Sequence, residues 1–151
     1  MPAYDVTVST TAPPDVVWKL LLDAGTWPTW SPVDALVRER SLGLSSDGRD
    51  GVGTVRAYRT GRTVTTERLT ELREERLFAY EGVHAAALRN YRARIELHRE
   101  PDGGTRIRWH GEYEASWPAS WFLPRYMRKF MARMAQGLAS HAAALHDRTV
   151  N

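Results

Sequence analysis

Hydrophobic and polar residues alternate along much of the chain, and this period of two is typical of β-strands with one buried face. The clearest alternation lies in residues 88–100 and 105–115. One face of the first segment carries Tyr91, Ala93, Ile95 and Leu97. One face of the second carries Ile107, Trp109, Gly111 and Tyr113. Residues 101–104 have the sequence PDGG, which is typical of a tight turn, so the pattern predicts an antiparallel hairpin.

Further strands are predicted on both sides of a loop. Residues 4–10 alternate, and residues 33–42 also resemble a strand. Residues 41–53 are rich in Gly, Ser and Asp and indicate the loop. Strands are then expected over residues 53–60, 62–72 and 76–83, with a turn at Gly61 between the first two. The succession of neighbouring strands predicts a meander.

Helical spacing appears at both ends of the chain. Val16, Val17, Leu20 and Leu21 predict a helix of about ten residues that follows Pro13–Pro14 and ends near Gly25. Residues 26–32 combine two Trp with two Pro and predict a short packed helix or turn. A long apolar stripe over residues 120–146 is formed by Tyr126, Met127, Phe130, Met131, Met134, Leu138, Ala142 and Leu145. A helix over residues 124–146 would be about 34 Å long.

These elements indicate an α+β fold in a single domain spanning residues 1–151. We expect a curved antiparallel sheet of about seven strands, two short helices after the first strand and a long C-terminal helix against the sheet. Such an arrangement tends to leave a space between the helix and the sheet.

The composition of the chain limits the possible cellular location and the possible binding partners. The 151 residues contain no Cys, which excludes disulfides, thiolate metal sites and cysteine nucleophiles. No apolar run approaches the length of a membrane span, and residues 1–5 do not resemble a leader, so no transmembrane segment and a cytoplasmic location are expected. The net charge of +3 comes from 19 Arg and 2 Lys that are largely interleaved with acidic residues. This distribution predicts no nucleic-acid partner, and either a monomer or a homodimer is expected.

Two tryptophan-containing segments carry a family resemblance. Residues 17–23 (VWKLLLD) and 27–32 (WPTWSP) resemble the opening of the START/Bet v 1-like (SRPBCC) superfamily, and most closely its bacterial polyketide cyclase/dehydrase and lipid-transport group. Residues 51–53 (GVG), residues 65–69 (TTERL) through Tyr80, and the amphipathic C-terminal helix agree with it. The resemblance spans residues 3–146.

The resemblance implies a helix-grip fold whose cavity accepts a hydrophobic small molecule. Members include aromatases and cyclases, lipid carriers, hormone receptors and chaperone-like partners. For this chain the resemblance implies either cyclase or aromatase activity on a polyketide-like substrate, or a non-enzymatic lipid or hydrophobic-ligand carrier or protein-interaction module. The fold does not choose among these functions.

Several chemistries lack their motifs. The five His residues show no metal-ligand spacing, so no metal site is predicted. There is no GxSxG sequence, and no Gly-rich loop joins a strand to a helix. Triad hydrolysis and nucleotide binding are therefore unsupported, and no cofactor is expected.

Glu67 is the candidate catalytic residue. It shares strand parity with Leu69 and could point inward, where burial would raise the pKa of its carboxyl and suit it to act as a general base for enolisation. Two other interpretations remain: Glu67 could pair with a neighbouring Arg such as Arg59, or it could face solvent.

The candidate ligand-binding residues are Tyr80, Tyr91, Trp109, Gly111, Tyr113, Met127, Phe130, Met131 and Met134. The Tyr hydroxyls could donate to a carbonyl or phenol, Trp109 could stack on a ring, and the Met side chains could adapt to varied ligands. The alternative, which the residue types favour, is that these side chains simply fill the core. Gly111 could serve either the curvature of the sheet or clearance for a ligand.

The polar face of the C-terminal helix carries Arg125, Arg128, Lys129 and Arg133. These cations could dock an acidic partner or an anionic membrane surface, or they could simply be solvated. Trp117, Trp121 and Phe122 precede the helix and could form the rim of a cavity entrance.

Overall fold

The computed structural model describes residues 3–84 and 88–150. Met1 and Pro2, the first two residues of the segment 1–5 that was compared with a leader sequence, lie outside the described residues. Seven antiparallel strands form one sheet in the order β1-β7-β6-β5-β4-β3-β2. The strands are β1 (Ala3–Thr10), β2 (Ala35–Leu36), β3 (Val55–Thr60), β4 (Thr63–Arg73), β5 (Leu77–His84), β6 (Leu88–Arg99) and β7 (Thr105–Ala115). The helices are α1 (Pro14–Leu22), α2 (Trp27–Trp30) and α3 (Leu123–Val150), with 3-10 turns η1 (Ala24–Thr26), η2 (Arg38–Arg40) and η3 (Ala119–Trp121).

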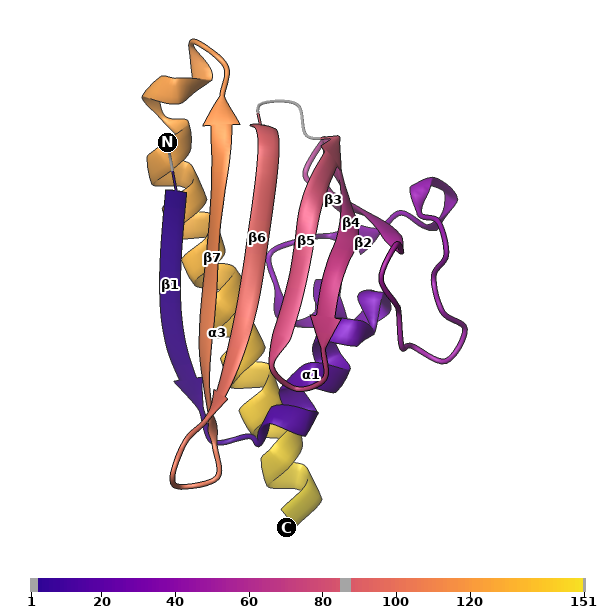
Figure 1. Cartoon of the computed structure of the whole chain (residues 1–151), viewed down its shortest axis with the longest axis vertical. Helices are drawn as coiled ribbons and strands as arrows, with labels where there is room; N and C mark the ends of the chain where they lie inside the picture. Colours follow the sequence, from indigo (N-terminus) through magenta and orange to yellow (C-terminus); the bar gives the residue numbers. More distant parts are fainter. Residues whose placement is uncertain (1–2, 85–87, 151) are drawn as a thin grey trace.

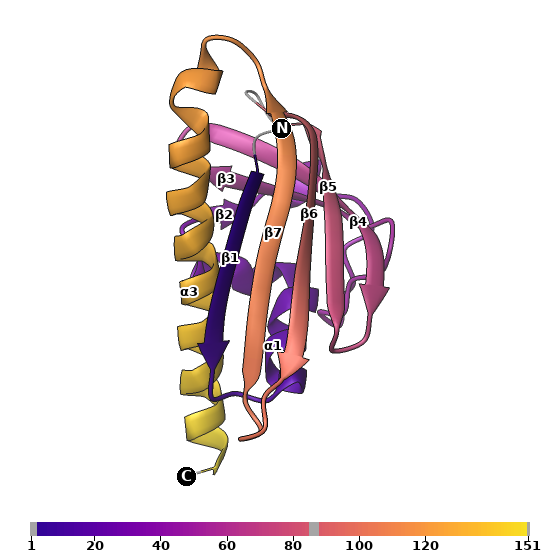
Figure 2. The ribbon, with the colours of Figure 1, turned by 60° about the vertical axis from the view of Figure 1, so that its left-hand side comes forward.

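The long helix α3 runs obliquely across the face of β1, β7 and β6 (Figure 1), and the strands lie along one side of it (Figure 2). The predicted α+β helix-grip architecture is confirmed, and so is the hairpin of β6 and β7. The side chain of Thr10 fastens the helix to the sheet, because its Oγ1 donates to the carbonyl of Ala139 at 2.8 Å.

Several predicted boundaries differ from the structure, and α1 ends at Leu22 rather than near Gly25. Residues 33–42 form the short strand β2, the turn η2 and an isolated bridge from Leu42 to Val55 instead of a continuous strand, because the hydroxyl of Ser41 replaces part of the backbone pairing. It accepts from the Ala57 N–H at 3.0 Å and donates to the Val37 carbonyl at 2.8 Å. The strand β3 begins at Val55 rather than at residue 53, and α3 extends over 28 residues to Val150.

The core around α2 is built from aromatic rings. Both Trp residues of the predicted short helix are buried, as expected for a packed segment. The ring of Trp27 stacks on Tyr58 at 5.4 Å and meets Trp109 edge-on at 5.7 Å. Close packing continues to α3, where a Cβ on Gly137 would lie 1.9 Å from the carbonyl oxygen of Trp30. Only glycine allows the two helices to approach this closely.

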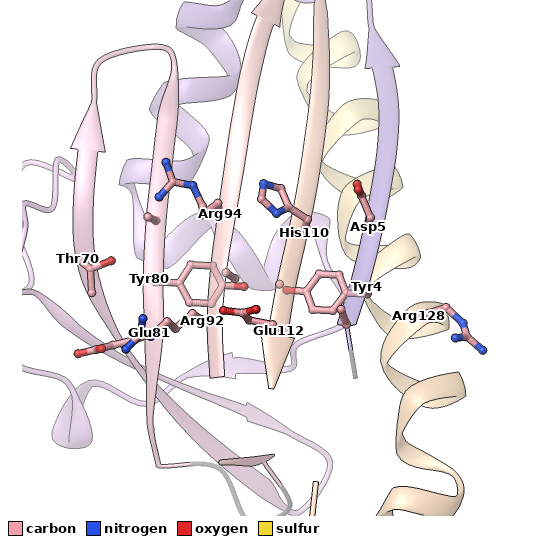
Figure 3. A pocket seen from close by; sticks show the side chains of 14 residues that line it. Tyr4, Asp5, Thr70, Tyr80, Glu81, Arg92, Arg94, His110, Glu112 and Arg128 are labelled. Atoms are coloured by element: carbon pink, nitrogen blue, oxygen red, sulfur yellow. The ribbon is translucent and has the colours of Figure 1, made fainter. Parts of the chain in front are cut away.

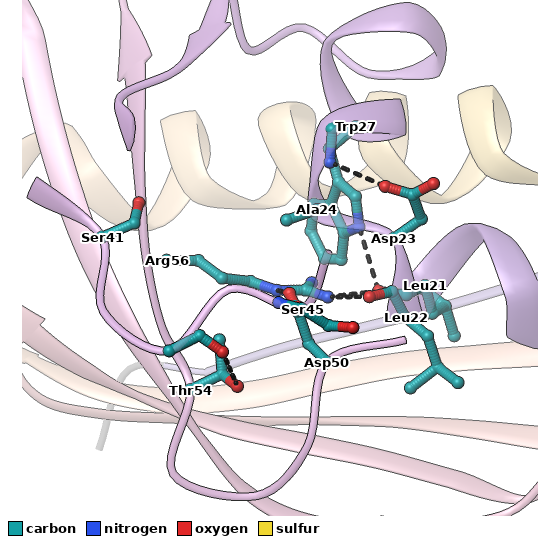
Figure 4. A network of polar contacts seen from close by, with 12 residues as sticks. Leu21, Leu22, Asp23, Ala24, Trp27, Ser41, Ser45, Asp50, Thr54 and Arg56 are labelled. Carbon is teal, nitrogen blue, oxygen red and sulfur yellow. Dashed lines mark hydrogen bonds and ion pairs between the residues drawn. The ribbon is translucent and has the colours of Figure 1, made fainter. Parts of the chain in front are cut away.

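A buried ion pair joins the end of α1 to the sheet. The Arg56 Nε donates to the Asp50 carboxylate at 3.0 Å, and both side chains are almost fully buried. The Arg56 Nη2 donates to the carbonyls of Leu21 at 2.8 Å and Leu22 at 2.7 Å (Figure 4). Arg56 therefore satisfies carbonyls at the C-terminus of α1, where the helix dipole also favours a cation.

Candidate functional site

A cavity of about 330 Å3 lies between the first half of α3 and strands β3, β4, β5 and β6. Its helix side is formed by Phe122, Leu123, Tyr126, Met127, Phe130, Met131 and Met134. Its sheet side is formed by Tyr58, Thr60, Thr63, Thr65, Thr66, Glu67, Tyr80, Gly82, Leu88 and Tyr91, and Trp27 and Val33 complete it. This volume lies in the range of small-molecule sites, and the lining is mainly apolar with a few polar groups, as such sites usually are.

Local strand geometry places Glu67 in this lining. On β4, Glu67 lies opposite Arg56 of β3 on one side and Gly82 of β5 on the other. The pairing of β4 with β5 is irregular between Thr66 and Glu67, and such irregularities often re-aim a side chain beside a site. Gly82, which is paired with Glu67 on β5, has no side chain to cover it.

Burial controls the charge of the Glu67 carboxyl. Loss of solvent raises the pKa of Glu67 to about 7, although the nearby Arg56 charge opposes this shift. Among the described residues none donates a hydrogen bond to the Glu67 carboxylate. The alternative of a pair with Arg59 is wrong, because Arg59 lies 3.5 Å from Asp34 instead. Glu67 is the only carboxylate in the described lining, which contains no His, Lys or Arg.

Three tyrosine hydroxyls form a network next to Glu67. The hydroxyls of Tyr4 and Tyr91 hydrogen-bond each other, and Tyr91 and Tyr80 are joined at 3.2 Å. The Trp109 Nε1 donates to the Tyr80 hydroxyl at 3.1 Å. Figure 3 shows Tyr4 and Tyr80 pointing toward each other across the strands that separate them. The network therefore links β1, β5, β6 and β7, and two of its members, Tyr80 and Tyr91, belong to the cavity lining.

These hydroxyls remain protonated at neutral pH. Burial raises the pKa values of Tyr4, Tyr80 and Tyr91 well above the usual range, and the Glu67 charge raises them further. Three hydroxyls carry three protons, and the two bonds between them use two. One proton is therefore left to donate outside the network.

The structure separates the predicted ligand-binding residues into two groups. Tyr80, Tyr91, Met127, Phe130, Met131 and Met134 line the cavity together with Glu67. Trp109, Gly111 and Tyr113 do not belong to the lining.

The three residues outside the lining have other surroundings. Trp109 is fully buried and packs against Trp27, and Tyr113 is a buried residue of the same core. The structure shows a close packing contact at Gly111. A Cβ at Gly111 would lie 2.8 Å from the hydroxyl of Tyr4 and 2.8 Å from the Arg92 carbonyl, so this glycine makes room for Tyr4 to reach Tyr91.

The sequence did not predict a role for Tyr4, Tyr58 or the threonines of the cavity. Tyr4 shares strand parity with Val6 and Val8, which could have placed it inside. Its contact with Tyr91 spans 87 positions of the chain, and no local pattern reveals it. Tyr58 donates its hydroxyl proton to the Ala24 carbonyl at 3.2 Å and so supports the wall.

A second hollow of about 800 Å3 lies over β1, β7, β6 and β5 (Figure 3). Its lining includes the charged or titratable side chains of Asp5, Glu81, Arg92, Arg94, His110 and Glu112. The same lining also includes Tyr4, Tyr80 and Gly111, and its many charged groups distinguish it from the lining of the first cavity. In residues 3–84 and 88–150, no cluster of three or more His, Asp or Glu residues could hold a metal ion.

Comparison with known families supports the fold and a general function. The family model described as "Polyketide cyclase / dehydrase and lipid transport" matches residues 1–145. None of the curated proteins compared with the chain matches it.

Solved structures share the same architecture. A START superfamily protein from Mycobacterium smegmatis has a TM-score of 0.76 at 14% identity, with 95% of this chain and 98% of that chain covered. The protein XoxI from Bacillus cereus has a TM-score of 0.75 at 17% identity, with 96% and 98% covered. A protein from Thermobifida fusca has a TM-score of 0.75 at 23% identity, with 96% and 95% covered. At these identities the likeness shows the fold alone.

Proposed function

We propose that this chain, which belongs to the polyketide cyclase/dehydrase and lipid-transport family, binds a ring-containing hydrophobic ketone in the cavity. Glu67 then removes a proton from the bound ketone. The observation that carries this proposal is the position of Glu67, a single carboxyl without a hydrogen-bond donor in a mainly apolar cavity. Its pKa of about 7 gives it both the charge and the basicity for proton transfer near neutral pH.

The chemical step is an enolisation. The Glu67 carboxylate takes a proton from the carbon next to the ligand carbonyl, and the C–H electron pair becomes the enolate. The enolate oxygen accepts a hydrogen bond from the tyrosine network, which has one proton to donate. In a poly-ketone the enolate carbon then attacks a second carbonyl of the same molecule, a C–C bond forms, and the new alkoxide takes the proton back from Glu67.

The apolar walls support ring binding. Tyr126 and Phe130 stack on each other at 5.7 Å along α3, and three Met side chains lie beside them in the lining. Flexible thioethers can adjust to rings of different shape. The described lining offers few polar groups away from the tyrosines, Glu67 and the threonines, so most of a bound molecule would meet apolar surface.

A carrier without catalysis is the second candidate. The observation that favours it is that Glu67 has no second acid or base beside it in the described lining other than the high-pKa tyrosines. A carrier would need the volume and the apolar walls but not the charge of Glu67.

Proton exchange on β-tetralone, a bicyclic aromatic ketone, tests the proposal. In D2O the protein should speed deuterium incorporation next to the carbonyl, and the rate should rise with pH and level off above about 7, because only the carboxylate form of Glu67 is a base. NMR follows the exchange directly. Glu67→Gln should reduce the rate by about two to four orders of magnitude, the usual contribution of a general base, and leave binding within a few fold.

Glu71→Gln is the matched control. Glu71 lies on the same strand but outside the cavity lining, and its carboxylate accepts a hydrogen bond from the Arg73 Nε at 2.8 Å. This variant should exchange protons like the unmodified protein. Unchanged exchange in Glu67→Gln would refute the role of Glu67. Binding of β-tetralone without exchange in any variant would favour the carrier.

A further inference from the structure

Four large aromatic side chains are exposed where β7 joins α3. Trp117 is 80% exposed, Trp121 84%, Phe122 62% and Tyr126 51%, and together they form the aromatic patch. The other four tryptophans of the chain are buried. Figures 1 and 2 show this connection at one extreme end of the molecule. A cluster of exposed aromatic residues on an otherwise well-packed domain indicates an interaction surface.

Positive charge lies beside the aromatic patch. Arg125, Arg128, Lys129 and Arg133 are exposed. Lys129 and Arg133 follow Arg125 at successive spacings of four residues, and Arg128 lies three residues after Arg125, so the four share one face of α3 and form the basic stripe. No acidic residue occurs between Glu114 and Asp147. Within the described chain no carboxylate pairs with any of the four, whereas seven other arginines take part in ion pairs.

The combination of these two surfaces fits a lipid bilayer. Trp and Tyr favour the interface between lipid and water, because their rings are apolar and their N–H or O–H groups are polar. Cations close to such rings are attracted to anionic headgroups. None of the helices in the described segments is long and apolar enough to cross a membrane. Contact through this surface would therefore be peripheral.

A second copy of the chain fits this surface less well. A two-fold dimer built on the aromatic patch would bring two basic stripes toward each other, and like charges that face each other oppose association. An anionic lipid surface complements the same charges. The charge pattern thus selects the bilayer over self-association.

We propose that the aromatic patch and the basic stripe dock the protein on an anionic membrane, with Trp117 and Trp121 in the headgroup region. Phe122 and Tyr126 belong both to the patch and to the cavity lining, so the docked face is continuous with the cavity wall. A hydrophobic molecule could then pass between the bilayer and the cavity without crossing water. The docking itself does not depend on which molecule the cavity holds.

Co-sedimentation with vesicles tests the proposal. The protein should bind vesicles of phosphatidylcholine and phosphatidylglycerol more tightly than vesicles of phosphatidylcholine alone, and added salt should weaken the binding. Trp117→Ala/Trp121→Ala should reduce partitioning by roughly tenfold or more. Arg125→Gln/Lys129→Gln should weaken binding to the anionic vesicles only.

Matched controls keep the test specific. Leu42→Ala/Val52→Ala removes exposed apolar side chains from the loop before β3, and Arg40→Gln/Arg106→Gln removes two exposed charges outside the basic stripe. Both control variants should bind vesicles like the unmodified protein. Fluorescence gives a second measurement, since vesicles should shift the emission of the two exposed tryptophans to shorter wavelength.

Two results would overturn the proposal. One is equal vesicle binding by the unmodified protein and the tryptophan variant. The other is that the unmodified protein does not bind anionic vesicles but forms a dimer in light scattering, and that Trp117→Ala/Trp121→Ala is a monomer. Far-ultraviolet circular dichroism of each variant shows whether the fold is intact, and neither Trp117 nor Trp121 belongs to the core.

Discussion

Replacing Arg56 with leucine should lower the free energy of unfolding by about 3–5 kcal/mol, the usual cost of removing one partner of a buried ion pair. The substitution leaves the Asp50 carboxylate buried without its cation, and it removes the donor to the carbonyls of Leu21 and Leu22. The Arg56 guanidinium also lies over the rings of Trp27 at 5.4 Å and Phe78 at 5.2 Å, and these contacts would be lost. Urea unfolding measures the change.

Two further variants show how much of the stability loss in Arg56→Leu comes from leaving a buried charge unpaired. Arg68→Leu removes a partner of Glu81 in a partly exposed pair at 2.9 Å and should cost no more than about 1 kcal/mol. Arg56→Leu/Asp50→Leu should recover part of the stability that Arg56→Leu loses, because no buried charge is then left unpaired. A loss of less than about 1 kcal/mol in Arg56→Leu would show that the buried pair does not hold α1 to the sheet.

Glu67→Gln should make the protein more stable at pH 8, by up to about 3 kcal/mol. Burial raises the pKa of Glu67 from 4.5 to about 7, so the folded state binds its proton more tightly than the unfolded chain does. Stability is therefore highest when Glu67 is protonated, below about pH 4.5. It falls as the pH rises toward 7 and stays low above that value. Glutamine mimics the protonated form and avoids the loss.

Urea unfolding of both proteins between pH 4 and pH 8 checks this prediction. The two curves should coincide near pH 4 and separate as the pH rises. Glu71→Gln, on the same strand but in ion pairs with Arg73 and Arg94, should show no such gain. Equal stability of Glu67→Gln and the unmodified protein at pH 8 would mean that the carboxyl is well solvated, and the proposed base would lose its physical support.

Alternation and helical spacing were sufficient to predict most of the fold. The hairpin of β6 and β7 has a clean period of two and a strong turn sequence, and the structure forms it with only a small change in its bounds. The same patterns wrongly predicted a continuous strand around Ser41. A side-chain hydroxyl that completes backbone pairing leaves no mark in the hydrophobic pattern.

The site was only partly predictable from the sequence. Strand parity with Leu69 suggested an inward Glu67, and the structure places it in the cavity lining. Parity could not distinguish cavity from solid core, so Trp109 and Tyr113 shared the correct face but not the lining. Arg56 shares parity with Tyr58 and gave no signal, because its partners Leu21 and Leu22 are 35 and 34 positions away.

The cavity as a site for a hydrophobic molecule is tested most directly by native mass spectrometry of the protein isolated from its own cells. We expect a species heavier than the 17.2 kDa chain by the mass of one small hydrophobic molecule. Thr65→Trp, which fills the cavity, should remove this species, whereas Thr70→Trp, on the same strand outside the lining, should keep it. Two results would contradict the account: a gently isolated protein that shows the mass of the chain alone, or an added mass that Thr65→Trp still carries.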